Sequence, residues 1–279
     1  MKVGVIGSGT MGAGIAQILA QQGHEVVLNA RRQTSVDGGI ANIDRQLTRL
    51  VQRERMTQED KDAVMARVSG TTVLEELKDV DLIIEAAAEE IESKKTLFKR
   101  LDEMLREDVI IATNTSSLSI TEIASATSRP DKVIGMHFFN PVPVMKLVEV
   151  INGVGTSKET EEFVINLSKE LGKTPVLVEE APGFVVNRIL VPMINEAVGI
   201  LAEGIASAED IDEAMKLGAN HPIGPLALGD LIGNDVVLNI MDVLYGEFGD
   251  SKYRAHPLLR KMVRGGKLGR KTKQGFFDY

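Results

Sequence analysis

Four polar residues could perform proton transfer at a carbonyl group if the fold brings them together. His137 ends an apolar segment, GMHF, and Glu149 lies in the next one, LVEV. Imidazole exchanges a proton near neutral pH, and a carboxylate on its far nitrogen would fix the tautomer and stabilise the imidazolium. Ser116 and Asn187 are neutral donors that can polarise a carbonyl oxygen without competing as bases. A lone histidine at a strand end also has a purely structural interpretation, and His24, His221 and His256 are given that interpretation here.

The expected positions of these residues are compatible with the chemical interpretation but do not decide between the two. Ser116 follows an expected strand at 109–113, and His137 ends one at 133–137. In an open α/β sheet, ligands bind outside the carboxyl ends of the strands. Asn187 opens the first helix of a second region, which could close over the site.

A glycine-rich turn near the start of the chain predicts a dinucleotide site. Residues 2–7 form an apolar run that ends in GSGTMG, followed by a helical pattern and a second apolar run. Gly7 would allow the sharp turn, Gly9 would let the backbone approach a pyrophosphate, and Gly12 would let the helix pack on the strand. Thr10 and Met11 open that helix, whose free N–H groups attract phosphate.

The end of the second apolar run departs from the pattern that is usual for NAD. An acidic residue there normally binds the ribose 2′-hydroxyl, but this chain has Asn29, Ala30, Arg31 and Arg32. Hydrogen bonds to charged groups are worth about 1.5–3 kcal/mol each, so one arginine contact to a 2′-phosphate gives roughly ten- to a hundredfold preference. We therefore expect NADP(H) to be preferred, with NAD(H) as the alternative if both arginines are merely solvated.

Composition limits the class of protein. The 279 residues allow two domains, and a net charge of −8 argues against nucleic acid as a partner. The chain has no cysteine, so disulfides and zinc–thiolate sites are excluded, and no metal site is expected. The first strand begins at once and no apolar run is long enough to span a membrane, so we expect a cytoplasmic protein without a membrane partner.

The hydrophobic pattern predicts an α/β fold followed by an all-helical region, with the boundary at about 182. Strand patterns alternate with helical ones up to that point, which indicates a mostly parallel, doubly wound Rossmann sheet covered by helices. The expected strands are 2–7, 25–28, 82–86, 109–113, 133–137, 145–151 and 174–178. The expected helices are 12–22, 36–55, 58–67, 93–106, 120–126 and 158–171. The polar stretch 36–67 is interpreted as a helical pair that projects from the sheet.

Beyond residue 182 only helices are expected. The ranges are 185–203, 208–217, 225–245 and 258–264. Pro192 should kink the first of these helices or start a new turn. Ser207 is expected to cap the second helix at its N-terminus.

Long uninterrupted blocks of the sequence resemble the 3-hydroxyacyl-CoA dehydrogenase family. The resemblance covers the whole chain and is carried by NTSSLSIT, GMHFFNPVPVMKLVEV, APGFVVNRIL, AMKLGANHPIGPLALGD and GRKTKQGFFDY. It implies hydride transfer between a nicotinamide cofactor and C3 of a short-chain acyl-CoA such as acetoacetyl-CoA. It also implies a helical second domain, residues 183–279, that forms a homodimer.

The resemblance also assigns roles to particular residues. His137 would be the catalytic acid and base, with Glu149 orienting it, and Ser116 and Asn187 would hold the 3-oxygen of the substrate. Glu89, Lys94, Asn140 and Lys271 match positions near the cofactor. Gln46 and Arg53, on the projecting helices, would contact CoA, although each could equally be ordinary surface polarity.

Residues 29–35, NARRQTS, are where the chain departs from the family, since the usual acidic residue is missing. This departure affects the choice of cofactor and not the reaction. Two other functions stay open: a dehydrogenase of a 3-hydroxy acid that lacks CoA, and a non-catalytic nucleotide-binding protein on the same scaffold.

Overall fold

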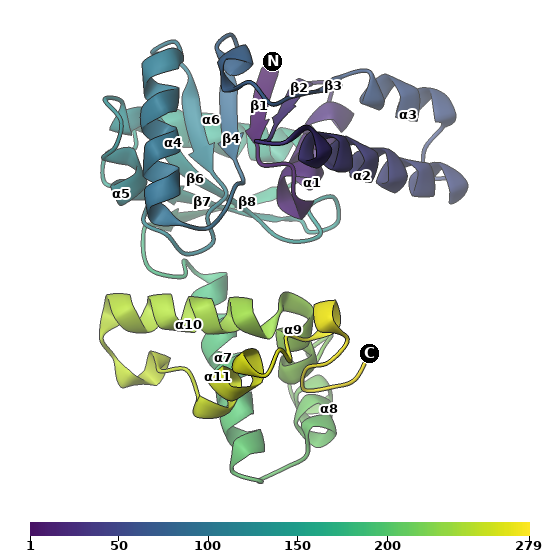
Figure 1. The fold of residues 1–279 in the computed structure, drawn as a ribbon, viewed down its shortest axis with the longest axis vertical. Helices are drawn as coiled ribbons and strands as arrows, with labels where there is room; N and C mark the ends of the chain where they lie inside the picture. The colour runs from purple at the N-terminus through teal and green to yellow at the C-terminus, as the bar shows by residue number, and fades with distance from the viewer. The chain divides into compact units, whose positions relative to one another are not determined.

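The computed structural model describes all residues from Met1 to Tyr279 and divides into two units, Met1–Glu180 and Ala181–Tyr279 (Figure 1). The first unit is built on one eight-stranded sheet in the order β3-β2-β1-β4-β5-β6-β7-β8. The strands are β1 (Lys2–Ile6), β2 (Glu25–Asn29), β3 (Val68–Thr71), β4 (Leu82–Glu85), β5 (Ile110–Thr113), β6 (Val133–Phe138), β7 (Leu147–Asn152) and β8 (Thr174–Glu179). All neighbouring pairs are parallel except β6 and β7. The expected Rossmann-type sheet is thus confirmed.

Helices of the first unit pack on this sheet through alternate strand residues. They are α1 (Thr10–Gln21), α2 (Gln33–Gln52), α3 (Gln58–Met65), α4 (Ile91–Met104), α5 (Ile120–Ala124) and α6 (Lys158–Glu170). One core joins α1, α2, α3 and α6 to inward-facing residues such as Val3, Val5 and Met136. The helices α4 and α5 contact each other. The helices α2 and α3 form a second contacting pair, which extends from one side of the sheet (Figure 1).

The strand β3 was not expected from the sequence. This strand, Val68–Thr71, is short, and its residues show no buried apolar face. It lies at the edge of the sheet, where only one neighbour, β2, pairs with it. An edge strand needs little apolar surface, so hydrophobic periodicity carries no signal for it.

The second unit is helical, as expected. Its helices are α7 (Val186–Ala202), α8 (Ala208–Gly218), α9 (Pro225–Ile232), α10 (Asn234–Phe248) and α11 (Pro257–Arg264). Ser207 caps α8 by accepting a hydrogen bond from the Asp210 N–H at 3.1 Å, and Pro192 is accommodated inside α7. The expected single helix over 225–245 is wrong, because Gly233, at φ +106°, separates α9 from α10. No helix in either unit has the length and apolarity needed to cross a bilayer.

Candidate active site

The glycine turn between β1 and α1 has the geometry that a dinucleotide requires. Gly7 has φ +102°, and a Cβ there would lie 2.4 Å from the Ala86 carbonyl oxygen. A Cβ on Gly12 would lie 1.7 Å from the carbonyl oxygen of Gly7, so only glycine allows the helix to start so close to the strand. A Cβ on Gly9 would meet nothing within 4 Å, which leaves open space where a pyrophosphate could approach the backbone.

The first turn of α1 adds hydrogen-bond donors to this space. Its first intrahelical bond runs from the Ala13 N–H to the Gly9 carbonyl at 2.9 Å. The N–H groups of Thr10, Met11 and Gly12 precede that bond, and in a helix such groups are left for solvent or a ligand. The turn therefore fits the phosphates of a dinucleotide, as the sequence predicts.

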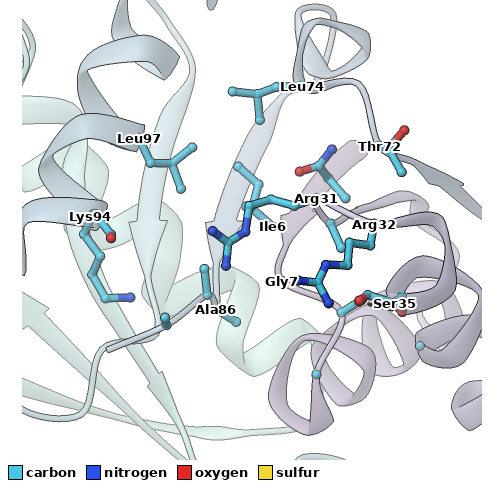
Figure 2. A pocket seen from close by; sticks show the side chains of 18 of the residues that line it. Ile6, Gly7, Arg31, Arg32, Ser35, Thr72, Leu74, Ala86, Lys94 and Leu97 are labelled. Carbon is cyan, nitrogen blue, oxygen red and sulfur yellow. Dashed lines mark hydrogen bonds between the residues drawn. The ribbon is translucent and has the colours of Figure 1, made fainter. Parts of the chain in front are cut away.

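An open pocket of about 1450 Å³ lies over this turn and extends to the end of β2. Figure 2 shows Arg31 and Arg32 reaching into it from one side, with Ile6, Leu74 and Leu97 forming an apolar wall. Glu75 is an acidic residue of the same lining, and its carboxylate is bound by the Arg100 guanidinium. Both arginines at the end of β2 are solvent-exposed, so their charges are available to a ligand.

The N-terminus of α2 borders the same part of the pocket. Arg32 is its N-cap residue and makes no side-chain capping bond, and the first turn contains no acidic residue. The Ser8 hydroxyl donates to the Ser35 carbonyl at 2.7 Å, which ties the glycine turn to this helix start. Asn29 also lines the pocket, but its amide donates to the Thr71 carbonyl at 3.2 Å and so holds β3 beside β2.

His137 and Glu149 form a buried hydrogen-bonded pair across the β6–β7 ladder. They are direct register partners, and the Nδ1 of His137 lies 2.8 Å from Oε2 of Glu149. Only 5% of His137 and 1% of Glu149 is exposed to solvent. The ring of Phe139 packs at 4.5 Å from the imidazole, between centroids. The carboxylate contact therefore holds the imidazole through Nδ1.

Ser116 belongs to a cluster of donors around Glu89. Oε1 of Glu89 accepts from the Ser116 N–H at 2.7 Å, from its hydroxyl at 3.1 Å and from the Thr115 hydroxyl at 2.6 Å. These contacts connect the loop after β4 with the loop after β5, and so bring together two residues that the resemblance places near the cofactor and the substrate.

Glu85 is a buried charge beside the pocket that was not singled out from the sequence. It ends β4, is fully buried, and accepts from the Lys94 ammonium at 2.6 and 2.7 Å, the Thr113 hydroxyl and the Ala87 N–H. Lys94, only 2% exposed, also lies 3.6 Å from Oε2 of Glu89. Glu85 therefore orders the Ala86–Ala87 segment under the pocket and, through Lys94, the Glu89 cluster. A single acid at the end of the apolar run LIIE was the available signal.

The other expected site residues belong to other loops and helices. Asn140 is exposed in the loop after β6, Gln46 is half-buried on α2, and Arg53 is exposed just beyond the end of α2. Asn187 and Lys271 belong to the second unit, where Lys271 pairs with Asp235 at 2.5 Å. The roles of these five residues in binding stay predictions.

Two of the remaining histidines have structural contacts. His256 caps α11 by accepting from the Leu258 N–H at 3.1 Å. His24 lies 3.3 Å from a carboxylate oxygen of Glu170, and its pKa is lowered, chiefly by burial.

Comparisons with known proteins agree with this architecture. Residues 2–181 match the NAD binding domain of 3-hydroxyacyl-CoA dehydrogenase, and residues 183–279 match its C-terminal domain. A 3-hydroxybutyryl-CoA dehydrogenase from Clostridioides difficile is 66% identical over all of this chain and 99% of its own length. The human mitochondrial hydroxyacyl-coenzyme A dehydrogenase is 43% identical over 99% of this chain and 90% of its own.

A solved structure is similar throughout. The crystal structure of (S)-3-hydroxybutyryl-CoA dehydrogenase from Ralstonia eutropha superimposes with a TM-score of 0.96 at 54% identity. The match covers 100% of this chain and 98% of that one.

The buried charges around Glu85 generate a stability prediction. Glu85→Gln keeps the side-chain shape but removes the charge that neutralises Lys94 in a buried environment. Leaving one charge of a buried pair without its partner costs about 3–5 kcal/mol. We therefore expect the free energy of unfolding, measured by urea denaturation, to fall by about that amount. Glu75→Gln, which removes the acid of an exposed pair, is the control and should leave the midpoint unchanged. Equal midpoints for both variants would contradict the role given to Glu85.

Proposed function

This chain belongs to the 3-hydroxyacyl-CoA dehydrogenase family and is a nicotinamide-dependent dehydrogenase, and from that premise we propose its substrate, cofactor and acid–base residues. It reduces acetoacetyl-CoA to (S)-3-hydroxybutyryl-CoA, reversibly, and prefers NADP(H). Relatives named 3-hydroxybutyryl-CoA dehydrogenase, up to 66% identical over the full chain, support the substrate. Family membership makes the alternative of a non-catalytic nucleotide-binding protein wrong.

The observation that carries the proposed chemistry is the buried contact between His137 Nδ1 and Glu149 Oε2. With Nδ1 held by the carboxylate, His137 presents Nε2 to the substrate oxygen. In reduction the imidazolium donates its Nε2 proton to the oxygen on C3, and in oxidation the neutral ring accepts that proton. Glu149 stabilises the charged ring and keeps it in one orientation.

The substrate oxygen also needs neutral donors. We assign that role to the Asn187 amide and to the Ser116 hydroxyl, which would turn from Glu89 to donate its one proton to the C3 carbonyl in the substrate complex. Glu89, which gathers Ser116 with its neighbours, keeps this loop at the end of β5 in place.

The cofactor would be held by the glycine turn and the end of β2. Gly7, Gly9 and Gly12 shape the backbone, and the first N–H groups of α1 face the space for the phosphates. Lys94, Asn140 and Lys271 are assigned to the cofactor because they match family positions near it. When bound, the nicotinamide supplies or takes the hydride at C3.

Three features of the pocket support NADP(H) over NAD(H). Arg31 and Arg32 line it with exposed guanidiniums (Figure 2), no acidic residue ends β2, and the α2 N-terminus adds a favourable dipole for an anion. Arg100 already neutralises Glu75, one of the three glutamates of the pocket lining with Glu90 and Glu92. A 2′-phosphate at the end of β2 would therefore meet positive charge.

The acyl-CoA would extend towards the helical pair. Gln46 and Arg53 lie on α2 and at its C-terminus, where a guanidinium can pair with a CoA phosphate. Free 3-hydroxy acids have no such phosphate, so CoA thioesters should be the preferred substrates, and a panel of both classes tests this preference. The second unit would carry the homodimer contacts that the family implies.

The acid–base assignment is tested by removing the proton carrier. His137→Gln should lower kcat by about 100- to 10,000-fold, since that is what a positioned acid–base group contributes. Glu149→Gln should also lower kcat, because the amide cannot stabilise imidazolium. Dissociation constants for the reduced cofactor, from nucleotide fluorescence, should stay within about threefold in both variants. Turnover close to wild type in His137→Gln would remove the proposed role.

Cofactor preference is tested by exchanging the charges at the end of β2. We expect kcat/KM with NADPH to exceed that with NADH by about ten- to a hundredfold, since each charged hydrogen bond contributes about 1.5–3 kcal/mol. Ala30→Asp combined with Arg31→Ile should reverse this order without reducing kcat with the preferred cofactor. The measurement is the steady-state rate of NADPH or NADH oxidation, followed at 340 nm, with acetoacetyl-CoA as the substrate.

Wild-type enzyme that uses NADH as well as or better than NADPH would rule out the preference. The same assay separates this outcome from the reaction itself, because an NADH-dependent enzyme would still reduce acetoacetyl-CoA and still depend on His137.

A further inference from the structure

The loop 139–146 joins the two strands that carry the acid–base pair. It leaves β6 after Phe138 and enters β7 at Leu147, so it is the connection of the hairpin in which His137 and Glu149 are opposite each other. Phe138 and Val148, the pair next to them, close the ladder at the loop end. Only Phe138 on β6, and Leu147 and Val148 on β7, separate this loop from the pair.

A buried lysine from a different part of the unit binds this loop. Lys173 lies between α6 and β8 and is only 9% exposed. Its ammonium donates to the Val142 carbonyl at 2.5 Å and to the Met145 carbonyl at 2.8 Å. No ion pair of the chain involves it, and burial lowers its pKa, so its charge is compensated by these carbonyl dipoles and not by an acid.

The loop is folded so that its carbonyls suit a cation. The N–H groups of Val144 and Met145 both donate to the Pro141 carbonyl at 3.0 Å, which forms a turn. The carbonyls of Val142 and Met145 are then left for the ammonium, as at the end of a helix, where cations are favoured. The Thr174 N–H donates to the Lys146 carbonyl at 2.7 Å, which fixes the backbone beside Lys173 to the same loop.

The opposite side of the loop rests on the dinucleotide helix. Val142 is 2% exposed and belongs to the core that includes α1. A Cβ on Gly14 of α1 would lie 2.8 Å from Cβ of Val142, so the helix and the loop touch at a position where only glycine fits. Gly14 follows the glycine turn by half a helical turn. The loop thus connects the strands of the acid–base pair with the helix whose start faces the cofactor phosphates.

We propose that Lys173 is a positioning residue, whose ammonium clamps the 139–146 loop against α1 and so sets His137 relative to the cofactor helix. This inference rests on the proposed acid–base role of His137. Lys173 itself contacts neither of the paired side chains. Its effect should appear in the chemical step, because small misplacements of a reacting group reduce rate more than binding.

The test replaces the ammonium by an apolar group of similar length, Lys173→Met. We expect kcat with acetoacetyl-CoA to fall by about 10- to 100-fold, while KM and the dissociation constant for NADPH stay within about threefold. Hydrogen exchange of the amides in 138–146 should become faster. Lys169→Met, an exposed lysine on α6 close in sequence, is the matched control and should behave as wild type.

Conservative replacement separates positioning from general stability. Lys173→Arg keeps a cationic donor and should recover part of the lost kcat. If Lys173→Met does not fold, Lys173→Gln, a shorter and neutral donor, replaces it and should show the same loss of kcat with faster loop exchange.

Wild-type kcat in the Met or Gln variant would overturn the proposal. A fall in kcat without faster hydrogen exchange in the loop would also overturn it. So would a fall in kcat accompanied by equally large increases in KM and in the dissociation constant for NADPH. Failure of the acid–base role is recognised separately, since His137→Gln would then retain turnover whatever the lysine variants do.

Discussion

The antiparallel pairing of β7 with β6 is the constraint on which the candidate active site depends. The strands β1 to β6 are parallel to one another, so residues on adjacent strands of this set are separated by long crossovers. At β6 the chain turns back directly, and this places Glu149 opposite His137 after a short loop. Cross-strand neighbours on one face have side chains within contact distance. A one-residue shift in register would turn one of the two side chains to the other face and abolish the contact.

Charged side chains at the carboxyl edge of β1–β6 are stabilised by hydrogen bonds in separate clusters; Glu85 and Lys173 are buried and Glu89 is exposed. Glu85 has Lys94, a hydroxyl and a backbone amide, Glu89 has the Thr115–Ser117 segment, and Lys173 has two carbonyls. An unpaired polar group at the buried positions would cost more than the bond it lost. Each cluster therefore has few alternative arrangements, and it orders a loop that bears residues for binding or chemistry. Rigid loops on a sheet edge are what acid–base catalysis requires, because reacting groups must be held close to their productive geometry.

Sequence reasoning succeeded where local pattern and local physics coincide. The glycine turn was predictable because each glycine has a steric reason that sequence spacing reveals, and the structure shows close approaches at Gly7 and Gly12. The strand β3 was not predictable, because a polar edge strand has no hydrophobic periodicity. The break at Gly233 was not predictable either, because a single residue with positive φ leaves the spacing of apolar residues unchanged. Glu85 and Lys173 were missed for another reason. Apart from the Ala87 N–H beside Glu85, their partners lie 9 to 31 residues away, so their burial depends mainly on tertiary contacts.

The position of the two arginines explains how a change in cofactor preference can leave the reaction intact. In the sheet order, β1, β4 and β5 lie between β2, which ends beside Arg31, and β6, which carries His137. With neighbouring strands about 4.8 Å apart, four spacings put these strands roughly 19 Å from each other. That exceeds the Debye length of about 8 Å at physiological salt. Charges exchanged at the end of β2 are exposed and distant, so they act on the imidazole far less than Glu149, which is in direct contact with it. A compact segment such as 29–35 can differ from the family pattern while the acid–base pair keeps its surroundings.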